Sequence, residues 1–459
     1  MSLRGEPRTN EGGSGGSNRK ARAGGVFLLA GATALALTAT ALAVGGPDPA
    51  PPAARTAPAA DAPLDRLGAG DLARGVRDLQ AHLRSQPEDA GAWATLGTAY
   101  VEQARTGGDP TRYPQAAKAF ARSLGIQPRD NDAAFAGRAA LAAARHDFRG
   151  ALRDAGRALA VNPYSERALS SRIDALVELG SYPKALAAAK EADSRRPGIP
   201  VFTRYAYVLE LRGDTKGARG VLTRALDSAA SSADTAYVAS ALGQLDWSQG
   251  QYDTALRHFT TALRADPGHL PALEGRARTQ AARGDTEAAR KGLEAVVARH
   301  PLPGQLVALG ELYEAEGRTA DARAQYELIG AWTALARANG VNTDLDTALA
   351  LADHGDRTEA LRSARAEWGK RHTVHTADAL AWALHVNGRS AEALRYVERS
   401  APAGSRNAVF LYHRGMIERA AGEKRAALRS LTAALDINPA FSPTGSRAAR
   451  AALKSLGAS

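Results

Sequence analysis

The stretch "QLVALGELYEAEGRTADARAQYELI", from Gln305 to Ile329, decides the fold because its spacing recurs along the chain. Its skeleton is a Leu-Gly pair, two aromatic residues, a glycine and an alanine: Leu309, Gly310, Tyr313, Gly317, Ala322 and Tyr326. The stretch "WATLGTAY" from Trp93 begins in the same way, and "SQGQYDTALRHFTTALRADP" from Ser248 ends in the same way. A recurring skeleton of this kind predicts an array of stacked structural repeats.

The alanine of this skeleton measures the period. It recurs ten times at intervals of 33–38 residues, at Ala116, Ala151, Ala185, Ala218, Ala255, Ala289, Ala322, Ala360, Ala393 and Ala427. Six of these alanines are followed 12 residues later by a proline, at Pro128, Pro163, Pro197, Pro267, Pro301 and Pro439. Glycines precede eight of them by five residues, at Gly180, Gly213, Gly250, Gly284, Gly317, Gly355, Gly388 and Gly422. Ten units therefore occupy residues 90–441.

Packing explains the residue types. A short turn between two helices needs a residue that tolerates a positive φ, which favours glycine. Two helix axes approach closely only where small side chains meet, which favours alanine, and a proline ends the second helix. One helical pair cannot bury its apolar face alone, so neighbouring pairs stack and share a core. The skeleton is therefore a packing code, and it needs no catalytic role.

The pattern Trp93-x-x-Leu96-Gly97-x-x-Tyr100, completed by Ala116, Phe120 and Pro128, resembles the tetratricopeptide repeat family. The resemblance implies an all-α, right-handed superhelical solenoid of about ten helix–turn–helix repeats over residues 90–441. Residues 64–89 are expected to form an N-terminal capping helix, and residues 442–459 a C-terminal one. The unit that contains Asp344 and Leu351 departs from the pattern because it lacks the aromatic residues.

The N-terminus has the features of a membrane-targeting segment. Residues 1–22 are rich in Gly and Ser and carry a net charge of +3, which predicts a disordered basic tail on the cytoplasmic side. The uncharged run 23–46 would span about 36 Å as a helix, enough to cross a bilayer as a signal-anchor. A Pro/Ala-rich linker, 47–63, follows. Everything after the run is expected to be extracytoplasmic, either tethered to the cell membrane or, alternatively, secreted after cleavage near Ala43.

Composition argues against several functions. The chain has no cysteine, which excludes disulfides and zinc–thiolate sites. Its net charge of +11 includes +3 in residues 1–22 and +3 in residues 447–459, and the rest is dispersed. We therefore expect no nucleic-acid partner, because such a partner needs concentrated basic charge.

No motif predicts catalysis. The "GGSGG" at 12–16 lies in the polar tail, and the "GAGDLA" from Gly68 has no strand before it. The histidine cluster His372, His375 and His385 is too sparse for a metal site, since ligands need one face and supporting groups. We expect no catalytic residue, no metal and no cofactor.

In the resembling family, first helices line a concave surface that holds extended peptides or partner helices. The inward-facing positions predicted to contact a partner are Tyr207, Glu210, Gln244, Trp247, Arg278, Glu311, Asp378, Trp382, His385, Tyr412 and Arg419. Each inward aromatic residue is either a partner contact or a filler against the next unit. The Lys/Asn clamp of chaperone-binding members is absent, because the matching positions hold Ala94, Thr98, Ala136, Ala140, Ser170 and Asp174.

These observations predict a non-catalytic, extracytoplasmic scaffold that binds a protein or peptide partner in the concave groove of the array. Two alternatives remain open at this point. One is a cytoplasmic regulator whose N-terminal run is not an export signal. The other is an enzyme with an unrecognised site on the array.

Overall fold

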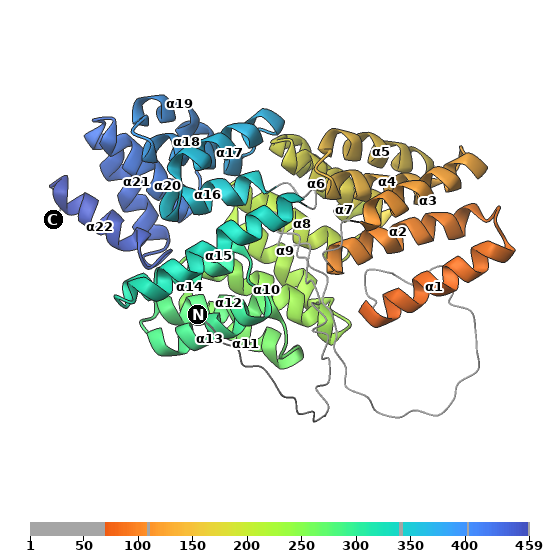
Figure 1. Ribbon diagram of the computed structural model, residues 1–459, viewed down its shortest axis with the longest axis horizontal. Helices are drawn as coiled ribbons and strands as arrows, with labels where there is room; N and C mark the ends of the chain where they lie inside the picture. The colour runs from red at the N-terminus through yellow and green to blue at the C-terminus, as the bar shows by residue number, and fades with distance from the viewer. Residues whose placement is uncertain (1–68, 108–110, 339–342, 402–403, 458–459) are drawn as a thin grey trace, which may run out of the picture.

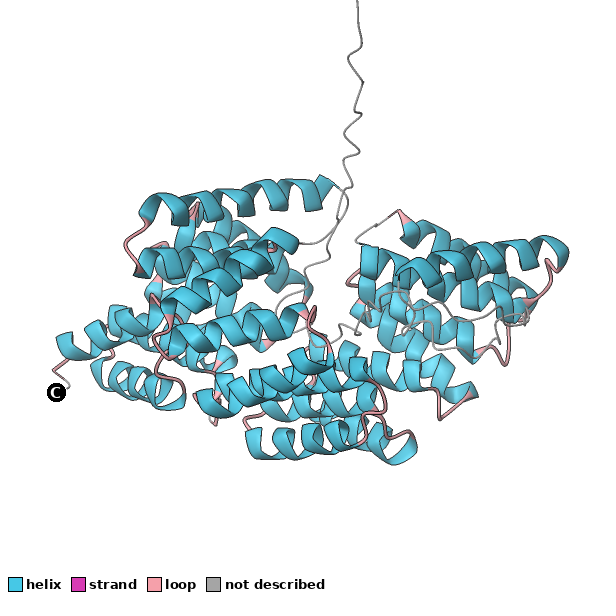
Figure 2. Ribbon diagram, turned by 90° about the horizontal axis from the view of Figure 1, so that it is seen from below, coloured by secondary structure: helices cyan, strands magenta, loops and turns pink. Residues whose placement is uncertain are grey.

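The computed structural model describes residues 69–107, 111–338, 343–401 and 404–457, and over these ranges the chain forms 22 α-helices and no strand (Figures 1 and 2). The predicted tail 1–22, membrane segment 23–46 and linker 47–63 lie outside the described residues. None of the helices in the described ranges has both the length and the apolarity that a membrane span requires. The all-α solenoid expected from the sequence is confirmed.

The helices follow one another as a lone helix, ten pairs and a final lone helix. The first is α1 (Ala69–Ser85) and the last is α22 (Gly445–Ser455). The pairs between them are α2 (Ala90–Gly107) and α3 (Arg112–Ile126), α4 (Asp132–Ala144) and α5 (Phe148–Val161), α6 (Glu166–Glu178) and α7 (Tyr182–Arg195), α8 (Ile199–Leu211) and α9 (Thr215–Asp227), α10 (Ser232–Ser248) and α11 (Tyr252–Ala265), α12 (Leu270–Ala282) and α13 (Thr286–Arg299), α14 (Pro303–Ala315) and α15 (Thr319–Ala338), α16 (Asp344–His354) and α17 (Arg357–Lys370), α18 (Val374–Val386) and α19 (Ser390–Ser400), and α20 (Ala408–Ala420) and α21 (Lys424–Ile437).

In α3 and α11, the aromatic residue of the second helix packs where two first helices carry glycine. Phe120 of α3 is fully buried between Gly97 of its own unit and Gly137 of the next. A Cβ atom added at Gly97 or Gly137 would lie 2.6 or 2.2 Å from the Phe120 ring. This arrangement explains why the Leu-Gly pair and the aromatic residue recur together, because the ring fills the space that the missing methyl groups leave.

Turn and cap residues set the helix ends. Of the eight turn glycines predicted from the spacing, Gly355 has a φ of −154°, whereas the other seven have a positive φ, for example 81° at Gly213 and 86° at Gly284. An aspartate follows each of these two glycines, and its carboxylate caps the next helix. Asp214 accepts a hydrogen bond from the Gly217 N–H at 2.8 Å, and Asp285 caps α13 in the same way.

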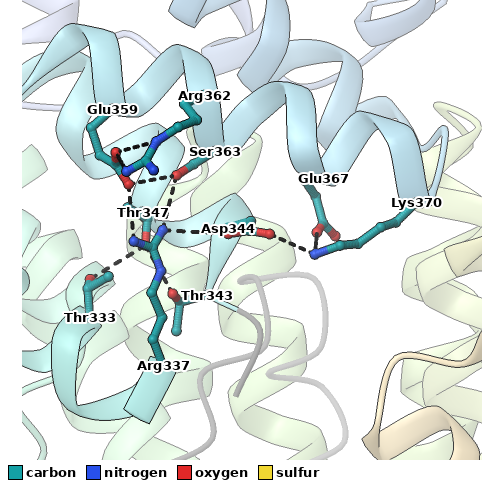
Figure 3. Close-up of polar contacts among 10 residues, drawn as sticks. All are labelled: Thr333, Arg337, Thr343, Asp344, Thr347, Glu359, Arg362, Ser363, Glu367 and Lys370. Carbon is teal, nitrogen blue, oxygen red and sulfur yellow. Dashed lines mark hydrogen bonds and ion pairs between the residues drawn. The ribbon is translucent and has the colours of Figure 1, made fainter. Parts of the chain in front are cut away.

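The unit of α16 and α17 lacks the aromatic residues of the repeat pattern, although α17 carries Trp368, and polar contacts hold it (Figure 3). Arg337, near the end of α15, donates to Glu359 at 3.1 Å and to Ser363 at 3.2 Å, both on α17. Its guanidinium also lies 3.5 Å from the Asp344 carboxylate at the start of α16. Lys370 donates to the same carboxylate at 2.7 Å. Ion pairs thus tie this unit to its neighbour where the aromatic filler is missing.

The array closes on itself along a line of contacts that we call the seam, where the turns after α6, α8 and α10 meet the segments after α17, α19 and α21. Three turn glycines lie there against backbone carbonyl groups. A Cβ atom added at Gly180 would lie 2.2 Å from the His372 carbonyl oxygen. The same distance is 2.1 Å between Gly213 and the Gly404 oxygen, and 2.8 Å between Gly250 and the Ile437 oxygen. Only glycine permits these approaches.

Hydrogen bonds between residues 186–193 positions apart hold the seam. The Val374 N–H donates to the Tyr182 hydroxyl at 2.8 Å. Further along, Asn438 donates to the Trp247 carbonyl oxygen at 2.8 Å, and the Tyr252 hydroxyl donates to the Asn438 side chain at 2.5 Å.

A buried ion pair completes the seam. Arg371 follows α17, and its guanidinium contacts both Glu178, at the end of α6, and Glu367. The side chains of Arg371 and Glu178 are only 4% and 6% exposed. In Figure 1 the end of α17 accordingly lies beside α6. The second half of the array therefore rests on the first half.

Candidate partner-binding groove

A cavity of about 870 Å³ lies on the inner side of the closed array. Its walls come from α10, α12, α13, α14, α16 and α20 and from the segment 440–450. The apolar part of the lining includes Ala281, Leu293, Val307, Leu312, Leu349 and Phe441, and the polar part includes Glu311, Glu314, Asp353, His354, His413 and Ser442. We call this cavity the groove.

Four of the residues predicted from the sequence meet in the groove, namely Trp247, Arg278, Glu311 and Tyr412. Arg278 lies 2.8 Å from Glu274 on the preceding turn of α12, and its guanidinium sits 5.9 Å from the centre of the Trp247 ring. Within the described residues, the indole N–H of Trp247 and the Nε–H of Arg278 have no hydrogen-bond partner. Two donors in the groove wall are therefore unsatisfied.

Glu311 of α14 is the polar centre of the groove. Ser442 donates to its Oε2 atom at 2.8 Å, Thr444 donates to its Oε1 atom at 2.9 Å, and His354 Nε2 lies 3.8 Å from Oε1. Burial raises the pKa of the Glu311 carboxyl, but His354 and the two hydroxyl donors outweigh it, so the pKa lies below its ordinary value. Glu311 is thus held as a carboxylate although its side chain is only 15% exposed.

The floor of the groove is a packed layer around Trp382, whose residue surface is 5% exposed. Its indole N–H donates to Asp353 at 2.8 Å, and its ring stacks on His413 with 4.1 Å between centroids. His413 in turn contacts Asp378 at 2.9 Å. Trp382 and Asp378 are therefore occupied by intramolecular packing, and the filler alternative describes Trp382 better than partner contact does.

The remaining predicted residues lie elsewhere. Tyr207 and Glu210 share α8, outside the groove lining, and burial raises the pKa of Glu210 to about 7. His385 lies 3.0 Å from the Ser390 hydroxyl, and burial lowers its pKa to about 4, with a further contribution from His413. Gln244 and Arg419 are exposed and do not line the groove.

Sequence reasoning missed the residues that come from irregular positions. Asp353 and His354 are at the end of α16, in the unit whose pattern is weakest. Ser442 and Thr444 follow the last unit and reach Glu311 across 131 and 133 positions. Only the hydroxyl-rich "FSPTGS" from Phe441 hinted at a polar role there. Among the described residues, no group of three or more His, Cys, Asp or Glu side chains is placed to hold a metal ion.

Two segments of the chain match family models of the tetratricopeptide repeat, residues 136–200 and residues 246–306. The first covers most of the units α4–α5 and α6–α7, and the second includes α11, α12 and α13. The chain therefore carries tetratricopeptide repeats, as the spacing of its sequence predicts. No curated protein matches the chain at a significant level.

Several solved structures are similar to this chain. A tetratricopeptide-repeat protein from Thermus thermophilus is 25% identical, with a TM-score of 0.34, over 37% of this chain and 92% of that one. PilF from Pseudomonas aeruginosa is 18% identical, with a TM-score of 0.38, over 47% and 94% of the two chains. Human IFIT1 is 14% identical, with a TM-score of 0.46, over 80% and 87%.

Proposed function

We propose that this chain of tetratricopeptide repeats is a non-catalytic scaffold that holds a segment of a partner protein in the groove. Tetratricopeptide-repeat proteins generally mediate protein–protein interaction. The observation that carries the proposal for this chain is the convergence of Trp247, Arg278, Glu311 and Tyr412 on one cavity. Trp, Tyr and Arg are the residues that most often anchor protein partners, and Glu311 adds a carboxylate beside them.

The size of the groove favours a segment over a folded domain. Its volume of about 870 Å³ is within the range of about 300–1,000 Å³ in which small ligands are held. The Arg278 side chain is 28% exposed, and its guanidinium is suited to acceptor groups, such as the carbonyl oxygens of an extended chain. A few residues of a partner would fill this space.

Capture of the partner tests the proposal. Chemical cross-linking in intact cells, followed by purification of the full chain, should recover a partner with the native protein. Trp247→Ala should lose that recovery with nearly unchanged melting, because a buried interface tryptophan contributes about 2 kcal/mol or more to binding. Trp382→Ala is the matched control, since removing a packed tryptophan costs about 3–5 kcal/mol of stability. Full recovery with Trp247→Ala would contradict the proposal.

We also propose that the array lies outside the cytoplasm, tethered by residues 23–46. The basic tail and the uncharged run support this topology. An alkaline-phosphatase fusion at Ala60 should be active, whereas a cytoplasmic regulator would give an inactive fusion. The N-terminal sequence of the purified protein then separates a retained anchor from cleavage near Ala43.

A further inference from the structure

The carboxylate at the centre of the groove is already occupied by the chain itself. Residues 439–446, which we call the latch, run from the end of the last unit to the start of α22. Ser442 and Thr444 of the latch donate to the two oxygens of Glu311. Phe441 is 5% exposed, and its ring lies 5.3 Å from that of Tyr412. The latch thus contacts two of the four groove residues that the sequence predicts.

The latch also presents the start of a helix to Glu311. The Ser442 hydroxyl accepts a hydrogen bond from the Gly445 N–H at 2.9 Å while it donates to Glu311. The first turn of α22 therefore begins beside the carboxylate, where the positive end of the helix dipole favours a negative charge. Hydroxyls and a helix start from another chain would satisfy Glu311 in the same way, and an aromatic ring from that chain could pack on Tyr412 as Phe441 does.

Glu311 depends on such donors. Without Ser442 and Thr444, the basic side chain described within 4 Å of its carboxylate is His354, at 3.8 Å, which is longer than a hydrogen bond. A largely buried carboxylate without hydrogen bonds is costly, because it loses hydration that nothing replaces. The latch can therefore leave the groove at low cost only when water or a second set of donors takes its place.

We propose that the latch is an internal ligand of the groove, and that the partner replaces it. The partner segment would carry an aromatic residue followed by serine or threonine hydroxyls at the start of a helix. This inference rests on the proposed function, since it names the chemistry of the partner for the same groove.

The first test needs no partner. The full chain with Ser442→Ala and Thr444→Ala together should show amide hydrogen exchange in residues 439–446 at least tenfold faster than the native chain. Ser455→Ala is the matched control, because its hydroxyl bonds the Ala452 carbonyl at 2.7 Å at the far end of α22. It should exchange like the native chain over 439–446. Unchanged exchange in the double variant would overturn the latch.

The second test uses a synthetic peptide of residues 436–456 as the probe. The peptide should bind the double variant at least tenfold more tightly than it binds the native chain, whose groove is occupied. Adding Glu311→Gln to the double variant, or placing alanine at Ser442 and Thr444 in the peptide, should remove that gain. Equal affinity for the native chain and the double variant, or no binding to either, would mean that the segment is only a wall of the groove.

The scaffold proposal and the internal-ligand proposal can be tested independently of each other. Both measurements above use only this chain and its own peptide, so a failed capture of a partner leaves them intact. If Trp247→Ala loses the partner while exchange in the double variant stays unchanged, the scaffold stands and the internal ligand is wrong.

Discussion

Where two neighbouring first helices both carry glycine, the absence of their Cβ atoms leaves room for one aromatic ring between them. Phe259 repeats the arrangement of Phe120, since it is fully buried against Gly243 and Gly275. An added Cβ atom at Gly275 would lie 2.2 Å from the ring. Gly220, in α9, is also helical, yet nothing lies within 4 Å of the position of its absent Cβ atom. The two glycines therefore differ only in their neighbours.

This contrast gives a paired prediction. Gly275→Ala should lower the free energy of unfolding by about 1–3 kcal/mol, because the ring must move in a packed core. Gly220→Ala should raise it by about 0.5–1 kcal/mol, since alanine is the better helix residue and meets no neighbour. Urea unfolding of both variants measures the sign of each change in the free energy of unfolding. A loss of stability in Gly220→Ala as large as that in Gly275→Ala would contradict the packing argument.

Buried histidines give the fold a pH dependence. Burial lowers the pKa of His146, His375 and His385 to about 4, so each imidazole is neutral in the folded chain. In the unfolded chain a histidine has a pKa of about 6.5. The unfolded chain therefore binds more protons below pH 6.5, and these histidines reduce stability as the pH falls from about 6.5 towards 4.

The contribution of one histidine can be isolated. His385→Gln should reduce the loss of unfolding free energy between pH 7 and pH 5 by about 1 kcal/mol, because one proton fewer is taken up on unfolding. His372→Gln is the control, since its side chain is exposed. Urea unfolding at the two pH values checks both. Identical losses in His385→Gln and the native chain would contradict the assignment.

At the scale of helices and turns, the sequence predicts what depends on near neighbours. The turn glycines, the capping aspartates and the prolines all act within one unit, so their spacing is visible along the chain. Gly213 shows the limit of such reasoning. Its positive φ is predictable from its turn, but its contact with the Gly404 carbonyl is not. That contact depends on the rotation accumulated over several stacked units, and no single position encodes this rotation.

The contribution of Gly213 to the seam can be separated from its contribution to the turn. Gly317→Ala should cost about 1–2 kcal/mol, because its φ is 77° and nothing lies within 4 Å of the added atom. Gly213→Ala adds a clash with the Gly404 oxygen at 2.1 Å and should cost at least about 1 kcal/mol more. Hydrogen exchange at residues 404–407 should rise in Gly213→Ala and stay native in Gly317→Ala. Equal costs and equal exchange would show that the seam is not closed in solution.

At the scale of the whole molecule, the sequence predicts the groove in part. Trp247, Arg278, Glu311 and Tyr412 meet because each occupies an inward position of a regular unit. Trp382 occupies such a position too, but α20 of the next unit packs His413 over its ring. Ser442 and Thr444 belong to no unit, so no repeat offset could place them beside Glu311. The position of such residues depends on how the whole array curves and closes, and the repeat pattern does not predict this.

Closure itself should depend on one buried cation. Arg371→Gln leaves Glu178 and Glu367 without their guanidinium partner, and breaking a buried ion pair costs about 3–5 kcal/mol. Arg365→Gln is the control, because its side chain is 49% exposed and lies 3.8 Å from Glu392. Such an exposed pair contributes about 0–1 kcal/mol. Similar urea midpoints for the two variants would show that the buried ion pair of the seam contributes little to the stability of the molecule.

The seam also limits how this gene can change. An open repeat protein gains or loses one unit at little cost, because each unit contacts only its neighbours. Here Tyr182 meets Val374, and Trp247 meets Asn438, each pair 191 or 192 positions apart. Duplication or loss of a unit between them would move every later turn away from its counterpart. We therefore expect the copy number of the units between the two sides of the seam to be fixed in descendants of this gene, while single residues within them vary.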